Sequence, residues 1–137
     1  MTSAVFAVQA AIDALLVPRL ADFTPPGAAK GVPVYDHAPQ GAPYPYVRDG
    51  RKIVTAENLL AEKQQRVQFA ITVFSDFRGQ EQVDAILAEI EVILDDAELT
   101  LSTGACVRCD LDRADTTPDA DGVTYTGSAI YSVLIEP

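Results

Sequence analysis

The chain has 137 residues, 48% of them hydrophobic and 22% charged, a balance that excludes wholesale disorder and predicts one folded domain over residues 1–137. Its net charge of −10 is uneven: residues 1–78 carry eight Lys/Arg against seven Asp/Glu, whereas residues 79–137 carry two against thirteen. Because so acidic a half repels phosphate, the composition disfavours a grip on nucleic acid or on an anionic membrane. Residues 1–16 contain no Lys or Arg, which argues against a secretion signal.

The chain opens with a predicted helix that ends near Ala21. Thr2 or Ser3 can cap its start, and Pro18 is expected to kink or end it. Apolar residues at helical spacing define one face: Val5, Val8, Ile12, Leu15 and Leu16. A loop rich in proline and glycine is predicted over residues 22–33.

Two extended segments follow this loop. Val34 and Tyr35 form a predicted short strand, and a longer strand begins within residues 44–47. Asp49-Gly50 predicts a turn or bulge. Residues 51–63 are mostly polar and cannot easily be buried in their own protomer, so we interpret them as a long exposed hairpin arm.

The centre of the chain has the clearest periodicity. Val67, Phe69, Ile71 and Val73 alternate with other residues, which predicts a half-buried antiparallel strand. The period then changes to that of an amphipathic helix, with one apolar stripe: Val83, Ile86, Leu87, Ile90, Ile93 and Leu94. A sheet backed by this helix is the predicted core.

The second half contains three further predicted strands: residues 99–101, a strand opened by Gly104, and residues 123–135. The second of these carries Cys106 and Cys109. Side chains three apart on a regular strand point to opposite faces, so this spacing predicts one buried and one exposed thiol rather than a disulfide or a zinc site.

Residues 110–121 are predicted to form an acidic loop around Pro118. The loop offers the oxygen ligands that Ca²⁺ or Mg²⁺ takes: Asp110, Asp112, Asp115, Asp119 and Asp121. The EF-hand order is absent, so a solvated hairpin loop is favoured over a metal site. His37, the single histidine, is interpreted as a hydrogen-bonded loop residue. We therefore predict no catalytic residues, no cofactor and no metal.

The order of these elements, with connections too short for most crossovers, predicts an α+β fold. In it, a mainly antiparallel sheet carries two packed helices.

The segment from Tyr35 to Val47, Tyr-Asp-His-Ala-Pro-Gln-Gly-Ala-Pro-Tyr-Pro-Tyr-Val, resembles the signature of phage tail-completion proteins. These are the tail terminators of long non-contractile-tailed phages and of gene transfer agents. The resemblance continues through Val73 to Gly79, the strand end and turn before the second helix, and it includes the opening helix and the final strand. It covers nearly the whole chain.

The resemblance implies a tail-terminator-like α+β protomer that assembles in the bacterial cytoplasm into a homo-oligomeric ring, a hexamer. The ring would cap the head-proximal end of the tail tube, with the tail-tube protein and the head–tail connector or stopper protein as partners. It implies no catalytic residues, and DNA would pass through the ring without specific binding. No residue pattern in the sequence encodes the ring number.

Two sets of residues acquire a role under this resemblance. Acidic side chains on the ring lumen would keep phosphates off the wall, and the candidates are Asp84, Glu91, Asp110, Asp112 and Asp115. The arm could contact the acidic half of a neighbouring protomer, with these candidates: Arg51, Lys52, Leu59, Leu60 and Lys63. A solubilising surface and a mobile hairpin tip are the respective alternatives.

Two other functions stay open at this stage. A small α+β binding module or accessory protein could use the loop that combines Tyr35, Tyr44 and Tyr46 with several prolines, although packing is the commoner role of such aromatic residues. A hydrolytic or metal-dependent enzyme could use the acidic loop.

Overall fold

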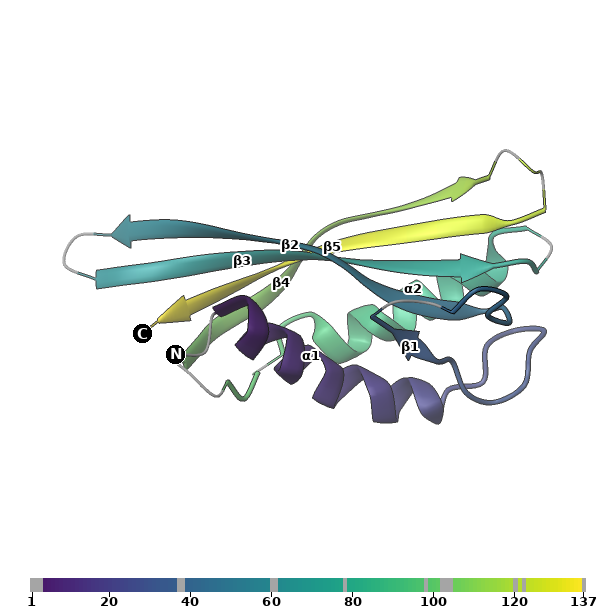
Figure 1. Cartoon of the computed structure of the whole chain (residues 1–137), viewed down its shortest axis with the longest axis horizontal. Coiled ribbons are helices and arrows are strands. Elements are labelled where there is room, and N and C mark those ends of the chain that lie inside the picture. The colour runs from purple at the N-terminus through teal and green to yellow at the C-terminus, as the bar shows by residue number, and fades with distance from the viewer. Residues whose placement is uncertain are drawn as a thin grey trace.

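The computed structural model describes residues 4–36, 39–59, 62–77, 79–97, 99–101, 105–119, 121 and 123–136. These contain two helices and five strands, shown in Figure 1. The helices are α1 (Ala4–Ala21) and α2 (Glu81–Leu94). The strands are β1 (Val34–Tyr35), β2 (Tyr46–Leu59), β3 (Glu62–Ser75), β4 (Ala105–Pro118) and β5 (Tyr125–Glu136).

The described strands form one sheet in the order β1-β2-β3-β5-β4. β1 runs parallel to β2, and every other neighbouring pair is antiparallel. Figure 1 shows both helices on one face of this sheet. We call this the covered face and the opposite one the open face. The predicted α+β fold, a mainly antiparallel sheet with two helices packed on it, is confirmed.

The central strand follows the predicted alternation. Val67, Phe69, Ile71 and Val73 of β3 are all buried on the covered face, and the ring of Phe69 stacks on that of Tyr131 from β5, with 5.6 Å between centroids. β3 is paired on both sides, so its covered face lies in the middle of the core. Alternating apolar residues in a central strand thus place the largest buried side chains under the helices.

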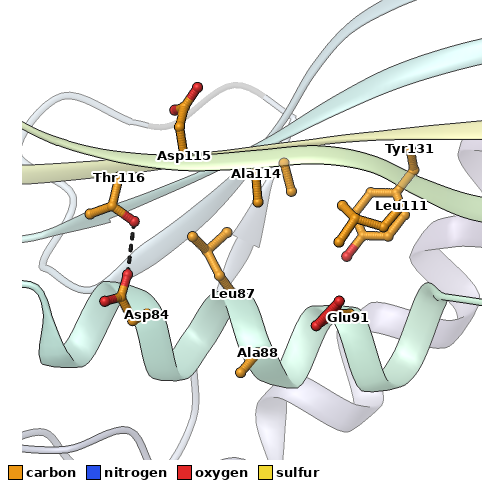
Figure 2. Close-up of a pocket in the computed structure, with 10 residues that line it drawn as sticks. Asp84, Leu87, Ala88, Glu91, Leu111, Ala114, Asp115, Thr116 and Tyr131 are labelled. Carbon is orange, nitrogen blue, oxygen red and sulfur yellow. Dashed lines mark hydrogen bonds between the residues drawn. The ribbon is translucent and has the colours of Figure 1, made fainter.

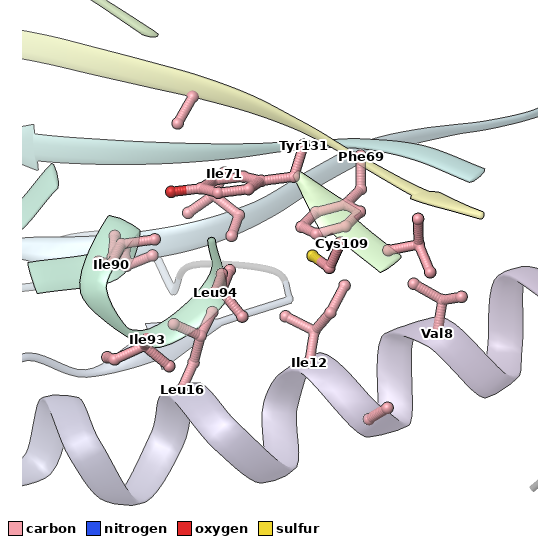
Figure 3. Packing of buried hydrophobic residues seen from close by; sticks show 14 of the residues in the cluster. Val8, Ile12, Leu16, Phe69, Ile71, Ile90, Ile93, Leu94, Cys109 and Tyr131 are labelled. Atoms are coloured by element: carbon pink, nitrogen blue, oxygen red, sulfur yellow. The ribbon is translucent and has the colours of Figure 1, made fainter. Parts of the chain in front are cut away.

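Both helices contribute an apolar stripe to the core, which Figure 3 shows between them and the sheet. On α2 the buried apolar residues are Val83, Ile86, Ile90, Ile93 and Leu94. On α1 they include Val8, Ile12, Leu16 and Leu20. α1 continues past Pro18 to Ala21, the predicted end. Its predicted caps, Thr2 and Ser3, lie outside the described residues.

The predicted arm is a β-hairpin. β2 and β3 pair antiparallel as far as Leu59 and Glu62, with a register shift between Asp49 and Lys52 that confirms a bulge at this point. β5 pairs with β3 only as far as Gln65, so within the described part of the arm residues 57–59 and 62–64 form a two-stranded ribbon. In Figure 1 this ribbon extends beyond the helices, at the left of the view.

The prediction of an acidic loop over residues 110–121 was wrong. β4 continues to Pro118 and pairs with β5 along its length, with two register shifts, one of them, between Leu111 and Arg113, inside the predicted loop. Charged residues are common in strands at the edge of a sheet, because they prevent pairing with other chains. The acidic sequence of β4 therefore resembles that of a loop, although the segment forms a strand. Only the turn that follows is irregular. There, hydrogen bonds from the Thr124 N–H, the Thr124 hydroxyl and the Val123 N–H lower the pKa of Asp121.

The two cysteines lie on the same face of β4, whereas opposite faces were predicted. Cys106 pairs with Ile135 and Cys109 with Val133, and both of those β5 residues point into the core. A register shift between Cys106 and Arg108 inserts an extra residue, which breaks the alternation. Both thiols are free, and Cys106 is partly buried rather than exposed. Burial raises the pKa of Cys109 to about 12.

The predicted strand over residues 99–101 was also wrong, because these residues belong to no strand. Leu99 is buried in the core and Thr100 is exposed. The alternation that suggested a strand comes from an irregular segment that packs one side chain inwards.

Candidate functional site

The metal-ligating side chains of the described residues are the first candidates for a functional site. Among the described residues, no group of three or more His, Cys, Asp or Glu is placed to hold a metal ion. His37 lies outside the described residues. In the same part of the chain, neither helix is long and apolar enough to span a membrane. The surfaces of the sheet are therefore the candidate functional sites.

The five acidic residues predicted for the ring lumen all lie at one edge of the sheet, next to β4. Asp84 and Glu91 come from α2 on the covered side, whereas Asp110, Asp112 and Asp115 come from β4 itself. Within the part of the chain that the structure describes, β4 has a neighbouring strand, β5, on one side only. The fold thus gathers carboxylates that are distant in the sequence at a free strand edge.

A groove runs between α2 and β4 at this edge, with a volume of about 350 Å³. We call it the α2–β4 groove, and Figure 2 shows the residues that line it: Asp84, Leu87, Ala88, Glu91, Leu111, Ala114, Asp115, Thr116, Ala129 and Tyr131. The Thr116 hydroxyl donates a hydrogen bond of 2.8 Å to Asp84 across one end of it. Two carboxylates of α2, Asp84 and Glu91, therefore border a mostly apolar lining. Figure 2 shows the Asp115 side chain on the side of β4 away from α2, and it pairs with Arg113 over 3.4 Å.

The Tyr131 hydroxyl lies in this groove without a partner. Tyr131 is fully buried, and its hydroxyl forms no hydrogen bond to any described residue. Burial, followed by the nearby charge of Glu91, raises its pKa. The groove could not be predicted from the sequence, because nothing there distinguishes Tyr131 from the other inward-facing residues of a long strand.

The open face next to β4 carries a second group of charges, and here the acids are paired. Arg108 forms a salt bridge of 2.8 Å with Asp110. The Gln68 amide and the Ser132 hydroxyl both donate hydrogen bonds to Asp112. The acidic residues on the open face are thus partly neutralised or hydrogen-bonded. On α2, which contains no Lys or Arg, Asp84 accepts the Thr116 hydrogen bond and Glu89 lies 3.9 Å from Arg19 of α1.

The predicted interface residues of the arm are placed by their backbone. Arg51 and Leu59 lie in β2 and Lys63 lies in β3, but their side chains are outside the described part of the structure. Leu60 lies outside the described residues altogether. Lys52 is half-buried, and its Nζ donates to the carbonyl oxygen of Gly50 over 3.3 Å.

The tyrosines that suggested a ligand groove pack against one another. The Tyr46 ring lies 5.7 Å from that of Tyr35 and 5.5 Å from that of Tyr44. It also stacks on Phe74 from β3, with a centroid distance of 4.9 Å. These contacts favour the packing interpretation.

α1 has a second apolar surface, on its outer side. Phe6 and Val17 are 66% and 47% exposed, and Ala10 and Ala14 lie exposed between them at helical spacing. The helix is thus apolar on two sides, a composition more typical of a buried helix than of a surface one. This surface suits a chain that works inside a larger assembly.

A cluster of polar groups holds α1 onto the sheet. The Gln9 amide donates to Asp49 over 2.6 Å and to Asp13 over 3.1 Å. Burial, then the hydrogen bond and charge of the Asp13 carboxyl, raise the pKa of Asp49 to about 7. The cluster joins α1 to β2 by side-chain hydrogen bonds, so we assign it a structural role.

A small α+β protomer with two free sheet edges, an acidic groove and a second apolar helix surface belongs to the class of structural proteins that assemble. The family comparison identifies the kind of assembly. Residues 3–136 match the model of the tail completion protein gp17 family, and the chain belongs to that family. It is therefore a structural component of a phage or phage-like particle tail, which assembles with other tail and head proteins.

Solved structures share the fold. A chain from the virion of a native gene transfer agent particle aligns over 100% of both chains, with a TM-score of 0.82 and 23% identity. A second solved protein aligns over 99% of both chains, with a TM-score of 0.61 and 18% identity. A search of the curated proteins finds no match.

Proposed function

We propose that this chain forms a ring that caps the head-proximal end of the tail tube, stops its growth and joins it to the head–tail connector. The family supports a role in tail completion. A growing tube ends in an open binding face, so a ring that covers this face without offering an equivalent one ends polymerisation. We propose that the ring is a hexamer, because the resemblance of the sequence to tail terminators implies a hexameric ring. The proposed role is structural and needs no catalytic step.

The single observation that carries the proposal is the position of the two free edges of the sheet. Among the described residues, β1 pairs with only two residues of β2, and no second strand lies beside β4, whose outer side is bonded only at Cys109 and Leu111 by residues that follow α2. Figure 1 places the arm and the Pro118 end of β4 at opposite ends of the sheet. Two different surfaces at opposite ends favour head-to-tail contacts, which close into a ring when the rotation allows it.

Charge supports the same arrangement. Residues 51–66, the arm and the start of the paired part of β3, carry four Lys/Arg against two Asp/Glu in a chain of net charge −10. The second half carries thirteen acids. We infer that the arm of one protomer contacts the acidic half of the next, with these residues as the basic and apolar contacts: Arg51, Lys52, Leu59, Leu60 and Lys63.

DNA must pass through such a ring without sticking to it. We propose that some of the five acidic residues at the β4 edge face the channel and repel phosphate: Asp84, Glu91, Asp110, Asp112 and Asp115. If an assembled ring placed all five on its outer rim, this part of the proposal would be wrong.

The test is to polymerise the cognate tail-tube protein with and without this chain and to measure tube lengths by electron microscopy. We expect rings, and tubes that are shorter and carry extra density at one end. Tubes of unchanged length, with this chain left in the supernatant, would contradict the proposal. Replacing Arg51, Lys52 and Lys63 by Glu should weaken ring formation. Reversing three exposed basic residues outside the arm, Arg19→Glu, Lys30→Glu and Arg48→Glu, controls for the equally more negative net charge.

A further inference from the structure

Two carboxyl groups meet where α1 lies against β2. Asp49 of β2 is directly opposite the uncharged Ile71 of β3, so its side chain points to the covered face, and the residue is only 7% exposed. Asp13 of α1 lies one helical turn after Gln9, whose amide donates to both carboxyls, over 2.6 Å to Asp49 and 3.1 Å to Asp13. We call Asp13 and Asp49 the carboxyl pair.

One oxygen of the Asp13 carboxyl lacks a donor. Gln9 donates to its Oδ2, whereas Oδ1 is buried and accepts no hydrogen bond from the described residues. Buried polar atoms of proteins are normally paired. The Asp49 carboxyl lies within hydrogen-bonding range of Asp13, and when protonated it can supply the missing donor. The hydrogen bonds of the pair are therefore complete only when one proton lies between the two carboxyls.

The charges around the pair favour this protonated form. Burial, then the hydrogen bond and charge of Asp13, raise the pKa of Asp49, and the opposing effects of the Gln9 amide and the Lys52 charge leave it at about 7. Lys52 already has a partner, because its Nζ donates to the Gly50 carbonyl over 3.3 Å. Two carboxylates without a proton would repel each other across a buried contact.

The carboxyl pair is also the part of this contact that can respond to pH. The other inward residues of α1, among them Val8, Ile12 and Leu16, are apolar and pack in the core. Their packing does not change when a proton is lost. A change of pH near neutrality therefore acts on the attachment of α1 through the Gln9 end of the helix.

We propose that Asp13 and Asp49 share one proton, and that this proton makes the attachment of α1 to β2 sensitive to pH. The Asp49 carboxyl donates to Asp13, while the Gln9 amide donates to both. When the proton is lost, two carboxylates face each other, and α1 separates from β2 more often. The inference adds a pH response to the structural role of this contact and does not depend on the proposed ring.

Hydrogen exchange of the intact protein tests this response. After correction for intrinsic exchange rates, the opening of α1, measured at the amides of residues 9–13, should rise about tenfold or more from pH 5 to pH 7, because the closed form alone holds the proton. Residues 113–117, at the opposite edge of the sheet, can open without disturbing the pair and should show no such rise. Equal rises in both segments would contradict the proposal.

Two isosteric variants separate a shared proton from an ordinary contact. Asp49→Asn carries a permanent donor in place of the proton, so α1 should open no more at pH 7 than at pH 5. Asp13→Asn can donate to an ionised Asp49 and should abolish the rise as well. Asp36→Asn, at an exposed position after β1, is the control and should keep the rise of the wild type. A rise that persists in Asp49→Asn would overturn the proposal.

Carbon-13 NMR of the side-chain carboxyls of the wild-type protein detects the proton without any substitution. We expect the signals of Asp13 and Asp49 to move together near pH 7, and that of Asp36 to move in the ordinary range of an exposed aspartate, about pH 4. If all three moved in the ordinary range while the protein stayed folded, no proton would be shared. If Mg²⁺ at constant pH moved the signals of the pair and pH did not, the pair would hold a cation, and the inference would be equally wrong.

Discussion

The two faces of β3 differ in burial, although they belong to the same strand. On the covered face, Phe69 and Ile71 are buried under both helices. On the open face, Gln68 and Thr72 are only partly buried. The difference indicates that the two faces have different roles. The covered face stabilises the protomer, whereas the open face and the free edges remain available for assembly.

The largest expected effect is on the covered face. Phe69→Ala removes a ring that stacks on Tyr131 in the middle of the core, and we expect a loss of about 3–5 kcal/mol in the free energy of unfolding. Thr72→Ala, on the open face of the same strand, should cost less than about 1 kcal/mol. Urea denaturation of the two variants measures both values, and equal losses would contradict the division.

The next effect concerns the close approach of α2 to β5 at Gly127. A Cβ at this position would lie 2.8 Å from Leu87 Cδ1 and even closer to Val83. Gly127→Ala should therefore destabilise the protomer by about 1–3 kcal/mol, since the helix must shift. Ser128→Ala, the adjacent residue on the other face, is the control. A Gly127→Ala variant as stable as wild type would show that α2 is not packed so tightly.

A smaller effect should appear as a pH dependence. The pKa of Asp49 is raised from 3.8 to about 7, so between these values the folded protein holds a proton that the unfolded chain releases. This group therefore stabilises the fold at low pH, and its contribution is lost as pH rises towards 7 and above. Asp49→Asn should remove this contribution. Thermal unfolding from pH 4 to 8 should show the difference between the two proteins, and parallel curves would contradict it.

The smallest effect on the protomer is expected at Tyr131. Tyr131→Phe removes an unpaired buried hydroxyl, so the free energy of unfolding should stay within about 1 kcal/mol of wild type or rise slightly. Urea denaturation measures this, and a loss of more than about 1 kcal/mol would show that the hydroxyl is stabilised by a hydrogen bond in the folded protein.

The covered face could be predicted from sequence because its signal is periodic. Phe69 and Ile71 alternate, Ile86 and Ile90 repeat at helical spacing, and a single regular element carries each pattern. The arm could be predicted for a different reason: its sequence is mostly polar and has no apolar face that could pack against the core.

The β4 edge could not be predicted, because its geometry depends on bulges and on contacts between distant segments. Two register shifts break the alternation of inward and outward side chains in β4, and the first of them puts Cys106 on the same face as Cys109. Without a regular alternation, the stretch that contains Asp110 and Asp115 resembled a loop. The groove exists only where α2 crosses this irregular strand. No local sequence pattern predicts where the helix and the strand cross.

Hydrogen exchange before and after assembly tests most directly the claim that the free edges of the sheet are used to build the ring. The account predicts that amides in residues 57–64 of the arm and residues 113–118 of β4 gain protection in rings. Amides in the middle of β3 and β5 should be equally protected in both states. Rings in which neither edge gains protection, while other surfaces do, would contradict the account.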